Sequence, residues 1–392
     1  MTLVQAKAPD GWTPVRLGDV GACIRGVGYN PAADLSATDL PTTVRLLRST
    51  NVQRRRVTLS DLQYVDQLRV SPAQILVDGD IVICIANGSK ALVGKSATFR
   101  SKDAYVYTFG AFMGCLRVDA SAADADFIGH LLQGDAYDIH ISLALAGSAI
   151  NNLSPSRIEE FEFLIPPIEE QRAIATALTD AAAWVESLDA LIAKKRDVRN
   201  ALLQRCFRGP SDLAPRGSNW SRVALGDVVT LEKGQLITEA TSGNGNIPVI
   251  AGGLMPSYYT DRFNRAGRLI SVSASGANAG YVALRQGPLW ASDCTTISES
   301  TNYDLIFLLA QLQLLQDKIY RAQTGGAQPH IHAVDLAPLV IHWCDLSSQI
   351  ALGRVLMDID AEIEALVSQR DKAELIRQGM AEDLLSGKVR LA

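Results

Sequence analysis

The sequence of 392 residues lacks several features that would assign it to a simple class. It has no uninterrupted apolar run near the ~18 residues of a membrane-spanning helix, and residues 1–20 lack the apolar core of a secretory signal peptide. Its six cysteines include no Cys-x-x-Cys pair, so neither a disulfide framework nor a structural zinc site is expected. These absences indicate a cytoplasmic protein without a membrane partner.

Charge of one sign is not in large excess, because 37 Lys and Arg residues stand against 42 Asp and Glu residues. The net charge of −5 excludes a histone-like basic protein, but it says nothing about local basic surfaces. Hydrophobic residues make up 47% of the chain and charged residues 20%, which excludes bulk disorder. At about 150 residues per domain, the length predicts two or three structural units.

Catalytic motifs are missing or incomplete. Residues 88–96 resemble a phosphate-binding loop, but five residues rather than four separate Gly88 from Gly94-Lys95-Ser96, and β-like residues follow. A glycine-rich turn between strands is the better interpretation. No Asn-Pro-Pro-aromatic or Asp-Pro-Pro-aromatic tetrad of an amino-methyltransferase occurs.

A metal site is not expected either. The only cluster of soft ligands comprises His330, His332, His342 and Cys344. Their spacing matches no zinc-ligand template, and the chain has only five histidines.

The chain contains an internal repeat. Residues 12–20 recur as 220–228 at an offset of 208, residues 79–83 as 267–271 at 188, and residues 147–209 as 325–387 at 178. The last match has no gap and includes the identical pair Gln171 and Gln349. The chain is therefore a duplication. Because the offset shrinks along the chain, the second copy is shorter, and the residues it lacks belong to the part that precedes residue 325.

Each copy ends in a predicted long helix with a heptad seam. The first seam comprises Ile174, Leu178, Ala181, Val185, Leu188 and Ile192, and continues through Val198 and Leu202. The second comprises Leu352, Leu356, Ile359, Ile363, Leu366 and Arg370, and continues through Ile376 and Met380. Each helix is expected to end near Gly209 or Gly387. At ~1.5 Å per residue, about 40 residues give rods of ~60 Å that should pack on each other, antiparallel.

The regions before the helices are mixed. Residues 41–118 and 220–300 are rich in short Val, Ile, Tyr and Thr runs broken by turn residues, and 125–145 and 303–320 have helical patterns. The predicted fold class is therefore α+β, with two globular domains joined by two long antiparallel coiled-coil helices and an internal pseudo-twofold duplication. The predicted boundaries are 1–165, 166–209, 210–343 and 344–392.

Two segments without acidic residues concentrate positive charge. Residues 44–60 carry Arg45, Arg48, Arg54, Arg55 and Arg56, and residues 262–292 carry Arg262, Arg265, Arg268 and Arg285. Amide and aromatic side chains lie in or beside them: Asn51, Gln53, Tyr258, Tyr259, Asn264, Asn278 and Tyr281. The arginines would bind phosphates, and the amide and aromatic side chains would read base edges or pack on sugars. A solvated face has the same composition, but recurrence in both copies favours nucleic-acid binding.

A set of short segments occurs in a fixed order along the chain: the repeated Trp-x-x-Val-x-Leu-Gly-Asp-Val and residues 47–52, 59–65, 76–82, 93–95, 163–171, 247–249 and 276–282. In this order the segments resemble those of the specificity subunit of type I restriction–modification systems. The second copy departs from the pattern where Cys344-Asp345 replaces Pro166-Pro167, which predicts a weaker helix start.

The resemblance implies that 1–165 and 210–343 are target-recognition domains, each reading one half of a bipartite DNA sequence. It implies that 166–209 and 344–392 are spacer helices that set the half-site separation and dock two modification subunits. Those partners bind S-adenosylmethionine and methylate adenine, and optional restriction subunits use ATP and Mg. This chain would be non-catalytic, hold no cofactor and bind double-stranded DNA.

The candidate DNA-contact residues are Arg45, Arg48, Asn51, Arg54, Arg55, Arg56, Lys90, Lys95, Tyr258, Tyr259, Arg262, Arg265 and Asn278. The main alternative is a coiled-coil scaffold that links two protein-binding domains. An ATP- or metal-dependent enzyme is a third hypothesis, which needs residues 88–96 or the histidine cluster to function.

Overall fold

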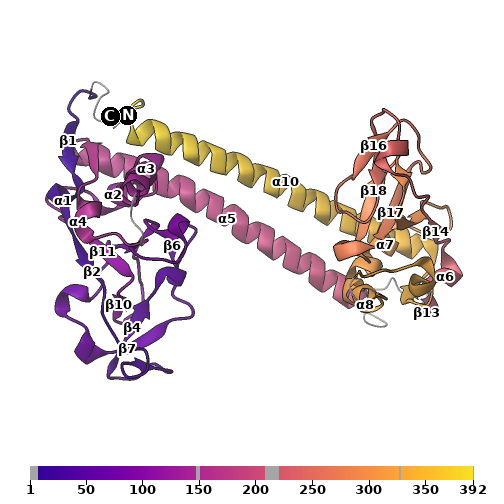
Figure 1. The fold of residues 1–392 in the computed structure, drawn as a ribbon, viewed down its shortest axis with the longest axis horizontal. Helices are drawn as coiled ribbons and strands as arrows, with labels where there is room; N and C mark the ends of the chain where they lie inside the picture. The colour runs from indigo at the N-terminus through magenta and orange to yellow at the C-terminus, as the bar shows by residue number, and fades with distance from the viewer. Residues whose placement is uncertain (1–7, 147–150, 208–219, 326–327, 392) are drawn as a thin grey trace. The chain divides into compact units, whose positions relative to one another are not determined.

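The computed structural model describes residues 8–146, 151–207, 220–325 and 328–391. The chain forms two compact units, one comprising Met1–Ser187 with Arg370–Ala392 and the other Leu188–Gln369. Each unit thus contains a globular part and a portion of each long helix, α5 (Ile168–Phe207) and α10 (Leu346–Leu385) (Figure 1). Gly147 and Gly209, which bound the predicted repeat, lie outside the described residues.

The globular part of the first unit is built on two four-stranded sheets (Figure 1). One sheet is antiparallel and has the order β2 (Gly21–Arg25), β11 (Met113–Val118), β8 (Ile81–Cys84) and β9 (Ser96–Thr98). The other has the order β10 (Tyr107–Phe109), β4 (Thr43–Leu47), β7 (Gln63–Asp66) and β3 (Leu35–Ser36). β1 (Thr13–Arg16) pairs with β12 (Glu162–Ile165), and β5 (Val52–Gln53) pairs with β6 (Arg56–Val57). The helices are α1 (Leu17–Val20), α2 (Ala125–Leu131), α3 (Asp135–Ala144), α4 (Pro155–Glu159) and the 3-10 turns η2 (Ser49–Asn51), η3 (Gln67–Arg69), η4 (Pro72–Gln74) and η5 (Lys90–Leu92).

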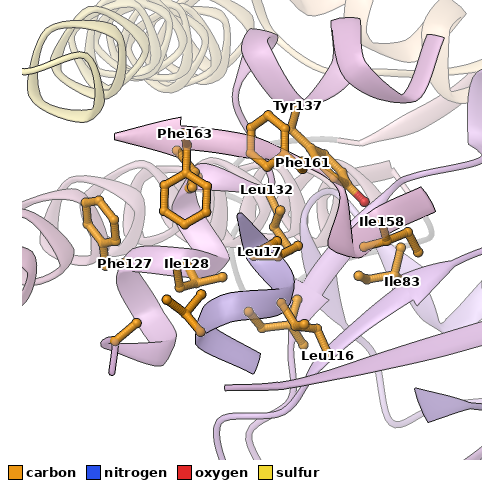
Figure 2. Close-up of a cluster of buried hydrophobic side chains, with 14 of the residues drawn as sticks. Leu17, Ile83, Leu116, Phe127, Ile128, Leu132, Tyr137, Ile158, Phe161 and Phe163 are labelled. Atoms are coloured by element: carbon orange, nitrogen blue, oxygen red, sulfur yellow. The ribbon is translucent and has the colours of Figure 1, made fainter. Parts of the chain in front are cut away.

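The core of the first unit joins these helices to the antiparallel sheet. Leu17, Ile83, Leu116, Phe127 and Phe163 gather there with other buried side chains from the strands and from α1, α2 and α4 (Figure 2). The same cluster includes Ile174, Ala175 and Leu178 of α5 and Leu384 of α10. The core therefore fixes the start of one long helix and the end of the other to the first globular part.

The second unit repeats the plan with fewer strands. Its antiparallel sheet has the order β14 (Glu232–Lys233), β20 (Cys294–Ser298), β17 (Arg268–Ser273) and β18 (Val282–Gln286). Its other sheet has the order β16 (Tyr258–Thr260), β15 (Ile247–Ile250) and β19 (Trp290–Ala291), and β13 (Ser221–Ala224) pairs with β21 (Val340–Trp343). The helices are α6 (Leu225–Val228), α7 (Leu305–Leu314), α8 (Gln316–Arg321), α9 (Ala333–Leu336) and the 3-10 turns η6 (Glu239–Thr241) and η7 (Gly276–Asn278). Within the described residues of this unit, β3 and the β5–β6 hairpin have no counterpart.

The strand registers confirm the duplication. Thr13 lies opposite Ile165 in the first unit, and Ser221 lies opposite Trp343 in the second. The sequence offsets of 208 and 178 convert the first pair into the second. The matching sheets also place β2, β11, β8 and β9 in the same order as β14, β20, β17 and β18.

A close backbone approach extends this equivalence past the repeated motif. A Cβ atom on Gly26 would lie 2.1 Å from the carbonyl oxygen of Gly110, and one on Gly234 would lie 2.0 Å from that of Ser292. No side chain fits at such distances, so both positions require glycine. Gly26 and Gly234 are again 208 residues apart.

Identical glutamines attach each long helix to its own globular part. Gln171 accepts a hydrogen bond from the Asp124 backbone N–H at 2.8 Å and donates one to the Pro166 carbonyl at 2.9 Å. Gln349 accepts from the Asp304 N–H at 3.0 Å and donates to the Cys344 carbonyl at 2.8 Å. Asp124 and Asp304 cap α2 and α7. Each buried amide therefore joins the helix start to a helix N-cap.

The two long helices, α5 (Ile168–Phe207) and α10 (Leu346–Leu385), both contain 40 residues (Figure 1). The expectation of a weaker start for the second helix is not met, because Asp345 accepts hydrogen bonds from the Ser348 N–H and hydroxyl at 3.0 and 2.8 Å. Hydrogen bonds from Ser347 and Ser348 lower the pKa of Asp345 to about 2. A capping carboxylate thus replaces the proline start.

The helices run antiparallel within each unit, as predicted. In the second unit Lys195 pairs with Glu362 at 2.7 Å, and Arg199, further along α5, pairs with Asp360, further back along α10. In the first unit the start of α5 and the end of α10 share one core.

The predicted continuation of the seam is wrong at Val198 and Ile376, whose exposed fractions are 50% and 53%. The physical reason is the 4-3 spacing itself, which from Ile192 leads to Lys195 and Arg199. Both of these side chains are half-buried and form the ion pairs to α10. Polar pairs therefore occupy the seam where apolar residues were expected.

Among the helices of the described ranges, none combines the length and the apolar character needed to cross a lipid bilayer.

Candidate DNA interface

Most of the predicted arginines in the first unit form ion pairs. Arg45, on β4, bonds Asp39 at 2.9 Å and Tyr107 at 3.1 Å, and its guanidinium lies 3.2 Å from the Tyr105 ring centroid. Arg48 donates to the Asp61 carbonyl at 3.0 Å and lies 3.5 Å from its carboxylate. Asp39 and Asp61 lie just outside the acid-free segment, so the isolated cluster that the sequence suggests is partly neutralised.

The arginine triplet forms the tip of the β5–β6 hairpin. Arg54 and Arg55 both have positive φ, at 47° and 65°, which is the two-residue turn of a tight hairpin. Arg56 follows and forms an ion pair with Glu186 of α5. The ion pair of Arg56 therefore attaches the hairpin to α5.

Arg55 and Arg54 differ in their surroundings. Burial, and then repulsion by Arg377, lowers the pKa of Arg55, although Glu374, Asp138 and Asp135 oppose the shift. Arg55 keeps an exposed surface beside these groups. Arg54 is exposed and has no hydrogen bond or ion pair within the described part of the chain.

Asn51 and Lys95 hold the loop that carries these arginines. Asn51 is 2% exposed and donates to the carbonyls of Thr58 and Ser60 at 3.1 and 2.9 Å. Lys95 donates to the carbonyls of Ser49 and Val52 at 2.6 and 2.9 Å. Their donors serve the fold of the loop, and their proposed contact with DNA remains a prediction.

The segment that resembles a phosphate-binding loop is a turn between strands. Residues 88–96 lie between β8 and β9, include η5 and end at the first residue of β9, so they lead into a strand and not into a helix. Lys90, in η5, is exposed and makes no polar side-chain contact in the described ranges. The sequence interpretation of a glycine-rich turn is confirmed.

In the second unit Arg262 and Arg265 also have partners. Arg262 lies 3.6 Å from Asp261, donates to the Thr241 carbonyl at 3.0 Å and sits 5.4 Å from the Trp290 ring centroid. Arg265 pairs with Glu232 at 3.0 Å and donates to the Thr296 hydroxyl at 2.8 Å. Arg265 therefore fixes β14 and β20 to each other.

The predicted tyrosines and amide are placed differently. Tyr258 donates its hydroxyl to the Ile237 carbonyl, so it supports the fold. Tyr259 is 54% exposed, and Asn278, in η7, is half-exposed. The side chains of Tyr259 and Asn278 have no hydrogen-bond partner among the residues the structure describes, so both are available to bind a ligand.

Sequence reasoning missed two exposed cations, Arg25 at the end of β2 and Lys233 at the end of β14. Neither has a carboxylate partner within the described ranges. The signal was present, because the offset of 208 that relates the two copies also relates these residues.

A metal centre is not found in the described ranges, where no group of three or more His, Cys, Asp or Glu residues could hold an ion. The His330 and His332 rings stack with their centroids 6.1 Å apart.

The comparisons with known proteins agree with this plan. Residues 9–194 and 217–374 match the family model described as the type I restriction modification DNA specificity domain. The chain is 31% identical over 236 residues to the type I restriction enzyme StySPI specificity subunit of Salmonella potsdam, a match covering 57% of this chain and 50% of that protein. It is 34% identical over 187 residues to the EcoKI specificity subunit of Escherichia coli (strain K12), covering 47% and 39%. These matches span half or less of the two relatives.

A solved structure shares the fold along the chain. The S subunit of a type I restriction–modification system from M. genitalium has a TM-score of 0.67 at 15% identity, covering 98% of this chain and 99% of that one.

Proposed function

The chain belongs to the family of type I restriction–modification DNA specificity subunits, and from this membership we propose that it is the non-catalytic subunit that selects the DNA target of such a complex. Each globular part reads one half of a bipartite sequence. The antiparallel helices set the distance between the half-sites. The complex acts in the cytoplasm, where its DNA target is located.

The duplication is the observation that carries this proposal. The same strand register occurs in both units, so the two domains offer equivalent frameworks to the duplex. The loops on these frameworks differ: arginine-rich turns stand in the first unit, whereas exposed Tyr259 and half-exposed Asn278 stand in the second. Two unlike readers on one repeated framework suit an asymmetric, interrupted target.

Exposed apolar side chains on the helices support docking of two modification subunits. Val198 and Ile376 are both half or more exposed, and they are 178 residues apart, the offset of the repeat. An apolar side chain repeated at equivalent positions suits two copies of one partner. In this proposal the modification subunits bind S-adenosylmethionine and methylate adenine, and restriction subunits, where present, use ATP and Mg.

The test is a methylome. The chain is expressed with its modification subunit in a host without other DNA methylation, and modified adenines are mapped by long-read sequencing. We expect an interrupted two-part motif with one methylated adenine on each strand. A stable complex with an active partner but no motif would instead favour the coiled-coil scaffold that links two protein-binding domains.

The same assay assigns residues to half-sites. Substitution of Arg54 or Lys90 should relax only one half of the motif, and substitution of Tyr259 or Asn278 only the other. Equal relaxation of both halves by one substitution would contradict the division of labour between the domains.

A further inference from the structure

We propose that Arg25 and Lys233 are a matched pair of contacts to DNA phosphates, one in each recognition domain. This inference rests on the proposed function, because it names residues by which each domain would hold the duplex.

The two residues occupy equivalent places in the fold. Arg25 lies opposite Gly114 at the end of β2, and Lys233 lies opposite Thr295 at the end of β14. The glycine that follows each cation donates to the neighbouring strand: Gly26 to the Met113 carbonyl at 3.0 Å, and Gly234 to the Cys294 carbonyl at 2.8 Å. The equivalence therefore rests on backbone pairing as well as on sequence offset.

The surroundings of the two cations are also related. Arg25 donates to the Asn152 side chain at 3.4 Å. Asn152 forms an isolated β-bridge with Ala86, and His330, 178 residues later, forms one with Ser275. Asn152 and His330 thus hold equivalent bridge positions in the two units. An acid lies near this bridge in the second unit, because Ser275 donates its hydroxyl to Asp293.

Unlike five of the predicted arginines, these two cations have no carboxylate partner in the described ranges and can bind an anion. Arg45, Arg48, Arg56, Arg262 and Arg265 have carboxylate partners. Arg25 and Lys233 are exposed, and in the described ranges neither forms an ion pair. Binding a phosphate would therefore break no intramolecular ion pair.

Their equivalence favours phosphates over bases as the ligand. Domains that read different half-sites must differ where they touch base edges, because those contacts carry the sequence information. The phosphate backbone is the same at both half-sites, so equivalent positions can keep a cation. A change from Arg to Lys preserves a charge that binds phosphate, although it would alter a two-pronged contact to guanine.

The test measures how DNA binding depends on salt. The complex with its modification subunits is titrated with a duplex carrying its methylome motif and with a duplex lacking it, from 50 to about 300 mM salt. Each phosphate contact contributes about 0.9 to the slope of log K against log salt. Arg25→Ala with Lys233→Ala should lower that slope by about 2, and each single change should weaken binding about eightfold near 0.1 M salt.

Three controls make the result decisive. Arg25→Lys with Lys233→Arg should restore the slope, because it keeps both charges. Arg157→Ala removes an exposed cation already paired with Glu160 at 3.0 Å, so it should leave the slope unchanged. Circular dichroism checks that each variant is folded.

An unchanged slope in the folded double variant, with normal binding by the unsubstituted complex, would overturn the inference. So would a changed methylation motif, because it would assign these residues to base reading. An unsubstituted complex that shows no motif and no preference for any duplex would instead refute the proposed function.

Discussion

Replacing either buried glutamine at a helix start should weaken one unit and spare the other. Gln171→Ala leaves the Asp124 N–H and the Pro166 carbonyl without the partners they have at 2.8 and 2.9 Å. An unpaired buried polar group costs about 1–3 kcal/mol, so the substitution should cost about 3 kcal/mol. Gln349→Ala breaks a matching pair of bonds at 3.0 and 2.8 Å and should cost about the same.

Hydrogen exchange with mass spectrometry separates the two effects. A loss of about 3 kcal/mol raises the exchange of amides that open with the affected unit on the order of 100-fold. Gln171→Ala should raise exchange in α2 and the start of α5, and Gln349→Ala in α7 and the start of α10. Gln369→Ala is the control, because the side chain of this exposed glutamine has no hydrogen bond in the described ranges.

Two outcomes would refute the reasoning. A cost below about 1 kcal/mol for both substitutions would mean that the buried amides do not anchor the helices. Equal loss of protection in both units after a single substitution would mean that the units do not open separately.

Three further predictions concern other parts of the chain. Gly26→Ala should prevent folding of the first globular part and Gly234→Ala that of the second, since either Cβ would lie about 2 Å from a carbonyl oxygen; limited proteolysis would show the loss, and retained resistance would contradict it. Hydrogen bonds from Arg390 lower the pKa of Glu170 below its ordinary value of 4.5, so the ionised carboxylate stabilises the fold above pH 4.5 and stabilises it less as the pH falls through the folded-state pKa. In urea unfolding, Glu170→Gln should therefore lower the free energy of unfolding at pH 7 and lower it less at pH 3. The same loss at both pH values would argue against the ion pair. Deleting residues 190–193 of α5 and 368–371 of α10 shortens each helix by ~6 Å. The deletion should change the spacer of the methylated motif by about one or two base pairs and leave the half-sites unchanged. An unaltered spacer would contradict the proposal that the helices set the half-site separation.

Repeated features of the fold could be predicted from the sequence because they recur at fixed offsets. The motifs that begin at Trp12 and Trp220 each form a strand followed by a short helix, and the two strands, β1 and β13, pair with the equivalent strands β12 and β21. The long helices also follow from their spacing. The predicted helix at 125–145 is divided into α2 and α3, and that at 303–320 into α7 and α8, with the break near Gly134 and at Leu315.

The candidate site was less predictable because charge pairing depends on folding. Counting acids within a segment missed Glu186 and Glu232, which lie far from their arginines in sequence and meet them in the fold. The prediction of the heptad seam considered only apolar residues, so it assigned Val198 to the seam, although the spacing leads to Arg199. Exposure and pairing are properties of the folded surface, so only the structure identified Arg25 and Lys233 as unpaired.

The division of the chain has a consequence for the order of synthesis. Most of the first unit precedes the second in the chain, yet the first unit also contains Arg370–Ala392. Glu170 accepts two hydrogen bonds from the Arg390 guanidinium, at 2.6 and 2.7 Å, so its partner is synthesised 220 residues after it. The second unit, although encoded later, has all its residues before the first is complete. A nascent chain therefore finishes its second recognition unit first. A chain that ended at Gln369 would keep every strand of both globular parts, but it would lack residues 370–385 of α10, which belong to the first unit.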